Sequence, residues 1–236
     1  RHENQDNAFI SGFFDEVPPG QRDAFDFSTR ITTEDPLVLG LCDGVGGGFV
    51  PGGQLSKLAG RTVSRAFQTG CFQPAPKDER PLDGQLYAAA CLAADAVLKA
   101  CEDADGGTTL CCAAIQGRQI ALAACGDTAA CLLRDGSLTR LFTPQNAAAE
   151  KRDAGEETEP GDERCLLHCL GMKDAEENFI CLSGELEPGD VLCICTDGIS
   201  ITQGALRFAL RHHISGKWIS RLCGFKRYND NASILI

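Results

Sequence analysis

The chain has 236 residues and a formal net charge of −11 at pH 7. A chain of this length can bury one large core, so we expect a single domain spanning residues 1–236. The acidic balance argues against nucleic acid as the main partner, because binding phosphates of DNA or RNA needs clustered Lys and Arg side chains. An acidic excess instead favours a cation site.

Many of the fourteen cysteines lie in apolar runs, as Cys42, Cys111 and Cys193 do. Free cysteine behaves as a small buried hydrophobe, so we expect core thiols in a reducing intracellular compartment, the cytoplasm or, if a targeting segment precedes the chain, an organelle. A zinc site at residues 165–169 would need a second ligand pair at finger-like spacing, which the sequence lacks. No run of about eighteen apolar residues and no signal-peptide pattern occurs, so we predict no membrane span.

The first half of the chain predicts two strands followed by two helices. Residues 7–14 form the first expected strand, and residues 15–35, with proline, glycine and mixed charges, form a connection that we expect to be a mobile insertion. Residues 37–43 are an apolar run typical of a buried strand. Apolar side chains then recur at intervals of three and four over residues 54–68 and 82–102, which predicts two amphipathic helices.

The pattern then changes to strands. Four short strands between residues 108 and 142, separated by turns at Gly117, Gly126 and Gly136, predict an antiparallel meander. The following charged segment, residues 146–163, nearly lacks large apolar side chains. We therefore expect it to be a second mobile insertion, a solvated loop without regular structure.

Two further strands are expected at residues 179–185 and 191–196. The turn sequence at residues 187–190, which contains proline and glycine, predicts that these two strands pair with each other. A helix at residues 205–212 and a last strand at residues 232–236 complete the chain. Antiparallel strands with helices before and after them predict an α+β fold.

One stretch carries a chemical signal. Residues 39–48 form an apolar run that ends in Asp43-Gly44 and further glycines, as a buried strand does where it enters a tight turn. The same pattern recurs at Asp197-Gly198, and Asp230 precedes the last strand. One such dipeptide proves little, since Asp135-Gly136 is read as an ordinary turn. Several strand-end aspartates that meet at one place would bind a hard cation such as Mg²⁺ or Mn²⁺.

Four further segments complete the pattern. The chain begins with Arg-His-Glu-Asn-Gln-Asp at residues 1–6. Three more segments follow later in the chain: Gly107-Thr108-Thr109, Gly126-Asp127-Thr128 and Asp230-Asn231. With the strand-end aspartates, their order and spacing resemble the metal-dependent serine/threonine protein phosphatases of type 2C, the PPM family, over nearly the whole chain. The motif Asp-Gly-Val-Gly-Gly resembles one branch of it. The resemblance implies a four-layer sandwich of two antiparallel β-sheets flanked by helices on both faces.

The resemblance also implies two Mg²⁺ or Mn²⁺ ions per active site. Asp43 would bridge them, the Gly44 carbonyl would contribute to one, and Asp197 and Asp230 would hold the other. A metal-bridged hydroxide would then hydrolyse phosphoserine and phosphothreonine on proteins. The expected partners are phosphoprotein substrates, and we expect a monomer.

Two residues near the N-terminus match further positions of the family. Arg1 matches the arginine that grips the substrate phosphate, for which a guanidinium fork is suited. Asp6 matches the first-motif aspartate, which supports metal-bound waters from the outer shell.

Three positions depart from the family pattern. Gln5 stands where many members have a glutamate that holds the second metal through water, so we expect weaker binding of that metal. Val45 stands where many members have a histidine whose proposed role is to protonate the leaving oxygen. Asp127 matches a position associated with a third, weaker metal, but its companion aspartate is replaced by Ile201, which argues against a third site.

These departures leave a second function open. The alternative to an active phosphatase is a catalytically weak or inactive pseudophosphatase that binds partner proteins as a scaffold. Nucleotide binding by the glycine-rich residues 44–53 is disfavoured, because no Gly-Lys-Ser/Thr sequence follows.

Overall fold

The computed structural model describes residues 4–11, 13–16, 36–68, 81–102, 104–199, 203–214, 231 and 233–236. Arg1, Ile201, Asp230 and residues 17–35 of the insertion expected at residues 15–35 lie outside these ranges. Within them the chain forms two antiparallel sheets. The five-stranded sheet has the order β1 (Asp6–Ile10), β2 (Leu37–Asp43), β3 (Leu110–Gln116), β4 (Gln119–Cys125), β7 (Ile180–Glu185). The four-stranded sheet has the order β6 (Ser137–Arg140), β5 (Ala129–Arg134), β8 (Val191–Cys195), β9 (Ile234–Leu235).

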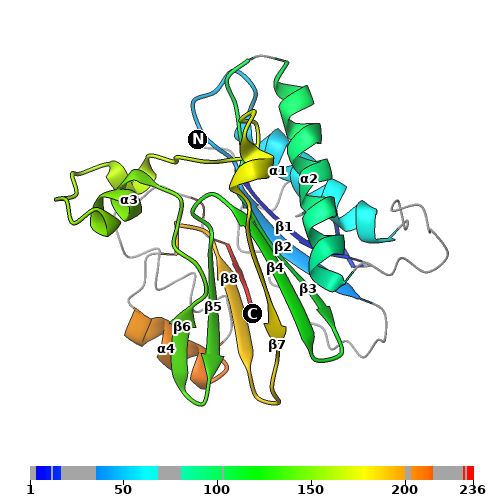
Figure 1. The fold of residues 1–236 in the computed structure, drawn as a ribbon, viewed down its shortest axis with the longest axis vertical. Coiled ribbons are helices and arrows are strands. Elements are labelled where there is room, and N and C mark those ends of the chain that lie inside the picture. The colour runs from blue at the N-terminus through cyan, green and yellow to red at the C-terminus, as the bar shows by residue number, and fades with distance from the viewer. Residues whose placement is uncertain are drawn as a thin grey trace.

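Two long helices cover the outer face of the five-stranded sheet (Figure 1). These are α1 (Gly52–Gln68) and α2 (Leu82–Cys101), within a few residues of the expected spans. The apolar stripes predicted from the helical period face the sheet, where Val63 and Val97 are buried in one cluster with Phe9. No helix in the described ranges is long and apolar enough to cross a membrane.

A second apolar layer lies between the sheets. Leu41 and Cys111 of the first sheet share a buried cluster with Ala130 and Ile194 of the second. On the far side of the second sheet, α4 (Gln203–Arg211) packs through Leu206 and Leu210 (Figure 1). The layers are therefore helices, sheet, sheet and helix, which confirms the predicted α+β fold.

The strand partners differ from the prediction in two places. β4 and β5 are not a hairpin, because the segment at Gly126 carries the chain from one sheet to the other. β7 and β8 do not pair across their turn either: Leu182 of β7 pairs with Leu122 of β4, and Leu192 of β8 pairs with Leu132 of β5. Placing the two strands in different sheets lets Ile180 and Leu192 both face the apolar layer between the sheets.

The charged segment at residues 146–163 is not the loop that we expected. It contains a helix, α3 (Ala147–Asp153), and leads into the short helix η1 (Asp162–Arg164). The Asn146 side chain caps α3 by accepting a hydrogen bond of 3.0 Å from the Ala149 N–H. The prediction was wrong because it relied on the low count of large apolar residues. This short helix is instead stabilised by its cap and by the 2.9 Å ion pair between Lys151 and Asp162.

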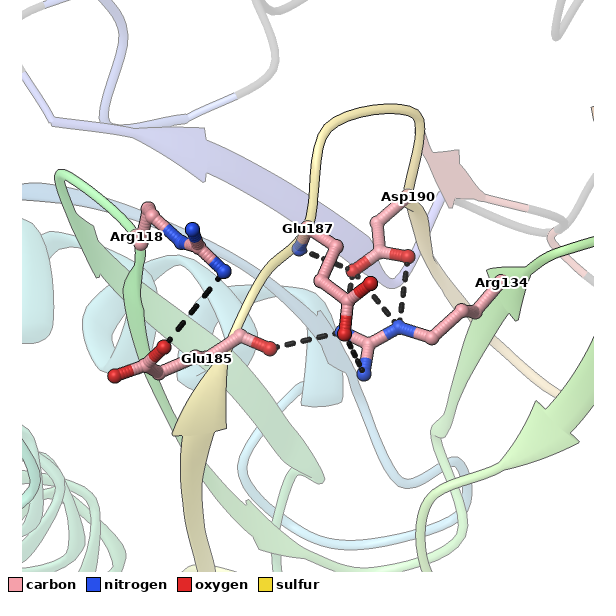
Figure 2. A network of polar contacts seen from close by, with 5 residues as sticks. All are labelled: Arg118, Arg134, Glu185, Glu187 and Asp190. Carbon is pink, nitrogen blue, oxygen red and sulfur yellow. Dashed lines mark hydrogen bonds and ion pairs between the residues drawn. The ribbon is translucent and has the colours of Figure 1, made fainter.

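A polar network ties the turn between β7 and β8 to β5 (Figure 2). The Arg134 guanidinium donates to Asp190 Oδ1 at 2.9 Å and to Asp190 Oδ2 at 2.5 Å, and it also donates to the Glu185 carbonyl at 2.8 Å. Asp190 Oδ2 accepts a further bond of 2.7 Å from the Glu187 N–H. Arg118 lies 3.8 Å from the Glu185 carboxylate. The bidentate pair fixes the turn before β8 to the end of β5, its partner in the same sheet, and the bond to the Glu185 carbonyl links both to the end of β7 in the other sheet.

We expect Asp190→Asn to lower the melting temperature at pH 7 by about 2–4 °C, because it loses the charge paired with Arg134. Arg134 holds the pKa of the Asp190 carboxyl below its usual value. A carboxyl whose pKa is lower in the folded state than in the unfolded state stabilises the fold at pH values above the unfolded-state pKa. This stabilisation is lost as the pH falls through the folded-state pKa. The difference between wild type and variant should therefore shrink below about pH 4. Asp95→Asn, at a 3.9 Å surface pair with Lys99, is the control and should change little; equal effects from both variants would contradict the prediction.

Candidate functional site

Asp43 is the last residue of β2, and its backbone is held on both sides. Its N–H donates to Thr109 Oγ1 at 2.9 Å. Its carbonyl accepts from Thr108 Oγ1 at 2.9 Å and from the Thr109 N–H at 2.8 Å. Thr109 Oγ1 is in turn 2.6 Å from Thr128 Oγ1. The strand end is therefore fixed at the point where the predicted metal-bridging carboxylate stands.

Gly44 makes a close approach that only glycine allows. A Cβ built on Gly44 would lie 2.3 Å from the backbone carbon of Gly52, the first residue of α1. The Gly44 N–H donates to the Gln5 carbonyl at 3.1 Å. The Gln5 side chain lies beside the same loop, since its Oε1 would be 3.4 Å from a Cβ on Gly46. The Asp43 turn is thus pinned between the start of α1 and the segment before β1.

Asp6 lies opposite Asp43 in the pairing of β1 with β2 and is only 3% exposed. Its Oδ2 accepts hydrogen bonds from Thr196 Oγ1 at 3.0 Å and from Ser233 Oγ at 2.7 Å. Its Oδ1 is buried and has no hydrogen-bond partner among the described residues. Burial raises the pKa of this carboxyl to about 6, and the charge of Asp197 adds to the effect. A buried acid oxygen without a partner is costly unless a cation or its water meets it.

Two more aspartates share this electrostatic environment. Asp197 follows β8 and is exposed, whereas Asp127 lies in the segment between β4 and β5 and is buried. Burial raises the pKa of Asp127 to about 6, and the negative charge of Asp197 acts in the same direction. A hydrogen bond with Asn146, the residue that caps α3, lowers it. Carboxylates from both sheets therefore meet at one end of the sandwich and repel one another.

The donor set fits hard divalent cations. Carboxylate and carbonyl oxygens are the ligands of Mg²⁺ and Mn²⁺, and a water bound to such an ion would give the buried Asp6 Oδ1 a hydrogen-bond partner. The described ranges contain no complete group of three His, Cys, Asp or Glu side chains arranged to hold a metal. Arg1 and Asp230, two members of the predicted site, lie outside those ranges. The roles of these residues therefore stay predictions.

Several hydroxyl groups that hold the site aspartates were not predicted from the sequence. Thr196 and Ser233 hold Asp6, and Thr108 and Thr109 hold Asp43. The Gly-Thr-Thr sequence was noticed as a motif, but nothing in it indicates which strand end its hydroxyls hold. Ser233 carries no local signal at all, because its partner lies 227 residues earlier in the chain.

Known proteins resemble this chain over most of its length. The sequence profile of the family Protein phosphatase 2C matches residues 20–225. No curated protein sequence gives a match. The solved structure of the catalytic domain of the serine/threonine protein phosphatase PstP in complex with 2 manganese ions is 21% identical, with a TM-score of 0.69 over 99% of this chain and 90% of that one.

Two further solved structures are similar. The serine/threonine phosphatase PstP/Ppp of Mycobacterium tuberculosis is 20% identical, with a TM-score of 0.68 over 99% of this chain and 91% of that one. The serine/threonine phosphatase Stp1 from Staphylococcus aureus is 16% identical, with a TM-score of 0.76 over 99% of this chain and 88% of that one. At these identities the structures show a shared fold, while the profile spans most of the sequence. The chain therefore belongs to the protein phosphatase 2C family, the hydrolases that act on phosphorylated serine and threonine in proteins.

Proposed function

We propose that the chain hydrolyses phosphoserine and phosphothreonine in proteins at a site that holds two Mg²⁺ or Mn²⁺ ions. The observation that carries this proposal is the buried Asp6 carboxylate with an unpartnered oxygen, directly across the β1–β2 pair from Asp43. Asp43, the Gly44 carbonyl, Asp197 and Asp230 would hold the ions. When bound, the ions supply the Lewis acidity that activates water and offsets charge on the phosphoryl group.

The residues of the chain have separate tasks in this proposal. Thr108 and Thr109 fix the backbone of Asp43, so that the strand end that carries its carboxylate need not move during the reaction. Asp6 orients water at the site from its buried position and is itself held by Thr196. Arg1 would bind two oxygens of the substrate phosphate through its planar guanidinium.

The test is metal-dependent hydrolysis by the full chain. Turnover of p-nitrophenyl phosphate and of a phosphoserine peptide would be measured against Mn²⁺ concentration, and Mn²⁺ binding would be measured separately by calorimetry. We expect hydrolysis of both substrates that saturates with the metal. Absence of both metal binding and turnover would overturn the proposal.

The second candidate function is a protein-binding scaffold of low catalytic activity. One observation favours it: the Val45 side chain faces Gly107, within 3.6 Å of where a Cβ on that residue would lie, and it carries no proton to donate. Gln5 likewise brings no charge to the loop that it borders. Normal metal binding without turnover of a phosphoserine peptide would select this function.

We expect Val45→His to accelerate hydrolysis of a phosphoserine peptide while leaving p-nitrophenyl phosphate almost unchanged. Serine is a poor leaving group that needs a proton, whereas p-nitrophenolate departs without one, and a positioned general acid contributes about 10²- to 10⁴-fold. The backbone at residue 45 is fixed by its 2.9 Å bond to the Gly107 carbonyl, so the imidazole would start from a defined place. The measurement is the single-turnover rate on both substrates as a function of pH, at saturating Mn²⁺.

Val45→Gln is the matched control, because it adds a polar side chain that does not titrate. A Val45→His variant that accelerates both substrates alike, or neither, would show that the proton comes from elsewhere and that Val45 is a neutral variation.

A further inference from the structure

The loop that follows Asp43 is closed and firmly attached. The backbones of Gly44 and Gly52 touch at its base, where a Cβ on either residue would overlap the other. Along one side, the Phe49 N–H donates to the Asp105 carbonyl at 2.8 Å, and the Val50 N–H lies 3.3 Å from the same oxygen. A Cβ on Gly48 would also lie 2.6 Å from that oxygen, so the loop packs tightly against this segment.

Phe49 projects from this fixed loop into solvent. Its side chain is 89% exposed, whereas its neighbour Val50 packs against the core beneath α1. Single exposed apolar residues are common on protein surfaces. Phe49 differs because the backbone on which it stands is hydrogen-bonded in place and begins directly after the Asp43 carboxylate. The ring therefore stands exposed on a fixed backbone, six residues after Asp43.

The chemistry of the loop selects the kind of side chain that would meet this ring. Residues 44–53 contain no charged or hydrogen-bonding side chain. The most exposed of them are Gly46, Gly47, Phe49 and Pro51, and the others that reach the surface are glycines and valines. Contact with such a surface favours an apolar side chain, because a charged one would lose water without gaining a partner.

The size of the loop limits where that side chain can lie. The base closes between Gly44 and Gly52, so the tip is at most four residues from the base, which is about 14 Å for extended chain. A substrate peptide bound in an extended form covers roughly 3.3 Å per residue. The side chain that meets Phe49 therefore lies within about four positions of the phosphorylated residue.

We propose that Phe49 is a specificity-determining residue that contacts an apolar side chain flanking the phosphorylated serine or threonine of the substrate. This inference rests on the proposed phosphatase function and deepens it. The preferred substrates are phosphoproteins with a leucine-sized or aromatic residue close to the phosphorylated one.

The test compares phosphoserine peptides in which a single leucine is moved through the four positions on either side, in an otherwise alanine background. For wild type we expect one position at which leucine raises kcat/KM about tenfold over alanine, the size of effect that an apolar contact of this area gives. Phe49→Ala should reduce this leucine-to-alanine ratio to about one, and Phe49→Leu should keep most of it. Phe208→Ala is the matched control: Phe208 is 59% exposed on α4, away from the loop, and its loss should leave the ratio at about ten.

A ratio near one in wild type, or an undiminished ratio in Phe49→Ala, would overturn the inference, even if Phe49→Ala lowered all rates together. Failure of the proposed function is recognised separately, because wild type would then hydrolyse neither the peptides nor p-nitrophenyl phosphate. In that case the dissociation constants of the same peptides would be measured by fluorescence anisotropy. Tighter binding of one leucine peptide by wild type that is lost in Phe49→Ala supports the inference, and equal affinities of wild type for the leucine and alanine peptides overturn it.

Discussion

Asp43→Asn is expected to lower phosphatase turnover by about a thousandfold or more while the chain stays folded. A neutral amide cannot replace the charge of a carboxylate that two cations would share, and each loss of about 1.4 kcal/mol in the barrier costs a factor of ten. Without metal, the melting temperature should not fall, since the substitution removes one charge from a cluster of like charges around Asp6. With Mn²⁺, wild type should gain stability by mass action and the variant should gain less.

Asp135→Asn is the control for this prediction. Asp135 is also followed by glycine, but it lies exposed in the turn between β5 and β6 with a positive φ of 51°, which asparagine tolerates. Its replacement should leave turnover and the Mn²⁺-induced stabilisation unchanged. If Asp43→Asn behaved in the same way, Asp43 would be an ordinary turn residue and the proposed metal site would be wrong.

Gly44→Ala is expected to lower the free energy of unfolding by about 3 kcal/mol or more, and to abolish turnover. The new methyl group would stand 2.3 Å from the backbone carbon and 2.4 Å from the backbone oxygen of Gly52. Backbone atoms at the start of a helix cannot rotate aside as a side chain can, so α1 or the Asp43 turn has to shift. Urea unfolding, followed by circular dichroism, measures the loss.

Gly46→Ala tests whether any added methyl group in this loop has the same effect. Among the described residues, a Cβ at Gly46 would meet only the Gln5 Oε1 atom, at 3.4 Å, and the φ of Gly46 is not in the left-handed region. We expect less than about 1 kcal/mol of destabilisation there. Equal losses from both substitutions would show that the close approach of Gly44 to Gly52 is not what constrains the loop.

The sequence by itself determined the features that depend on near neighbours in the chain. Leu86 and Val97 were predicted on the buried face of a helix at residues 82–102, and α2 spans Leu82–Cys101 with both side chains buried. The strand end at Asp43 was equally predictable, because an apolar run followed by Asp-Gly is a local pattern. The type 2C resemblance also rests on short motifs, and the family assignment confirms it.

At the site, the sequence indicated the acids but not what surrounds them. Asp6 was expected to act beside metal-bound water, whereas its burial and its bonds to Thr196 and Ser233 became visible only in the folded chain. These partners lie 190 and 227 residues from it, so no local pattern relates them. The raised pKa of the Asp6 carboxyl has the same origin, because burial is a property of the assembled sandwich.

Only the tertiary structure decided which strands pair. β7 and β8 both contain apolar residues that favour burial, but either sheet offers a place to bury them. A tight turn between them suggested a hairpin, yet β7 joined β4 and β8 joined β5. The helix α3 was missed for a different reason, because its Asn146 cap is a local signal, only three residues from the Ala149 N–H that it binds, and the low apolar content of the segment was given more weight. Strand partners are chosen by the packing free energy summed over the whole molecule, which a window of neighbouring residues does not contain.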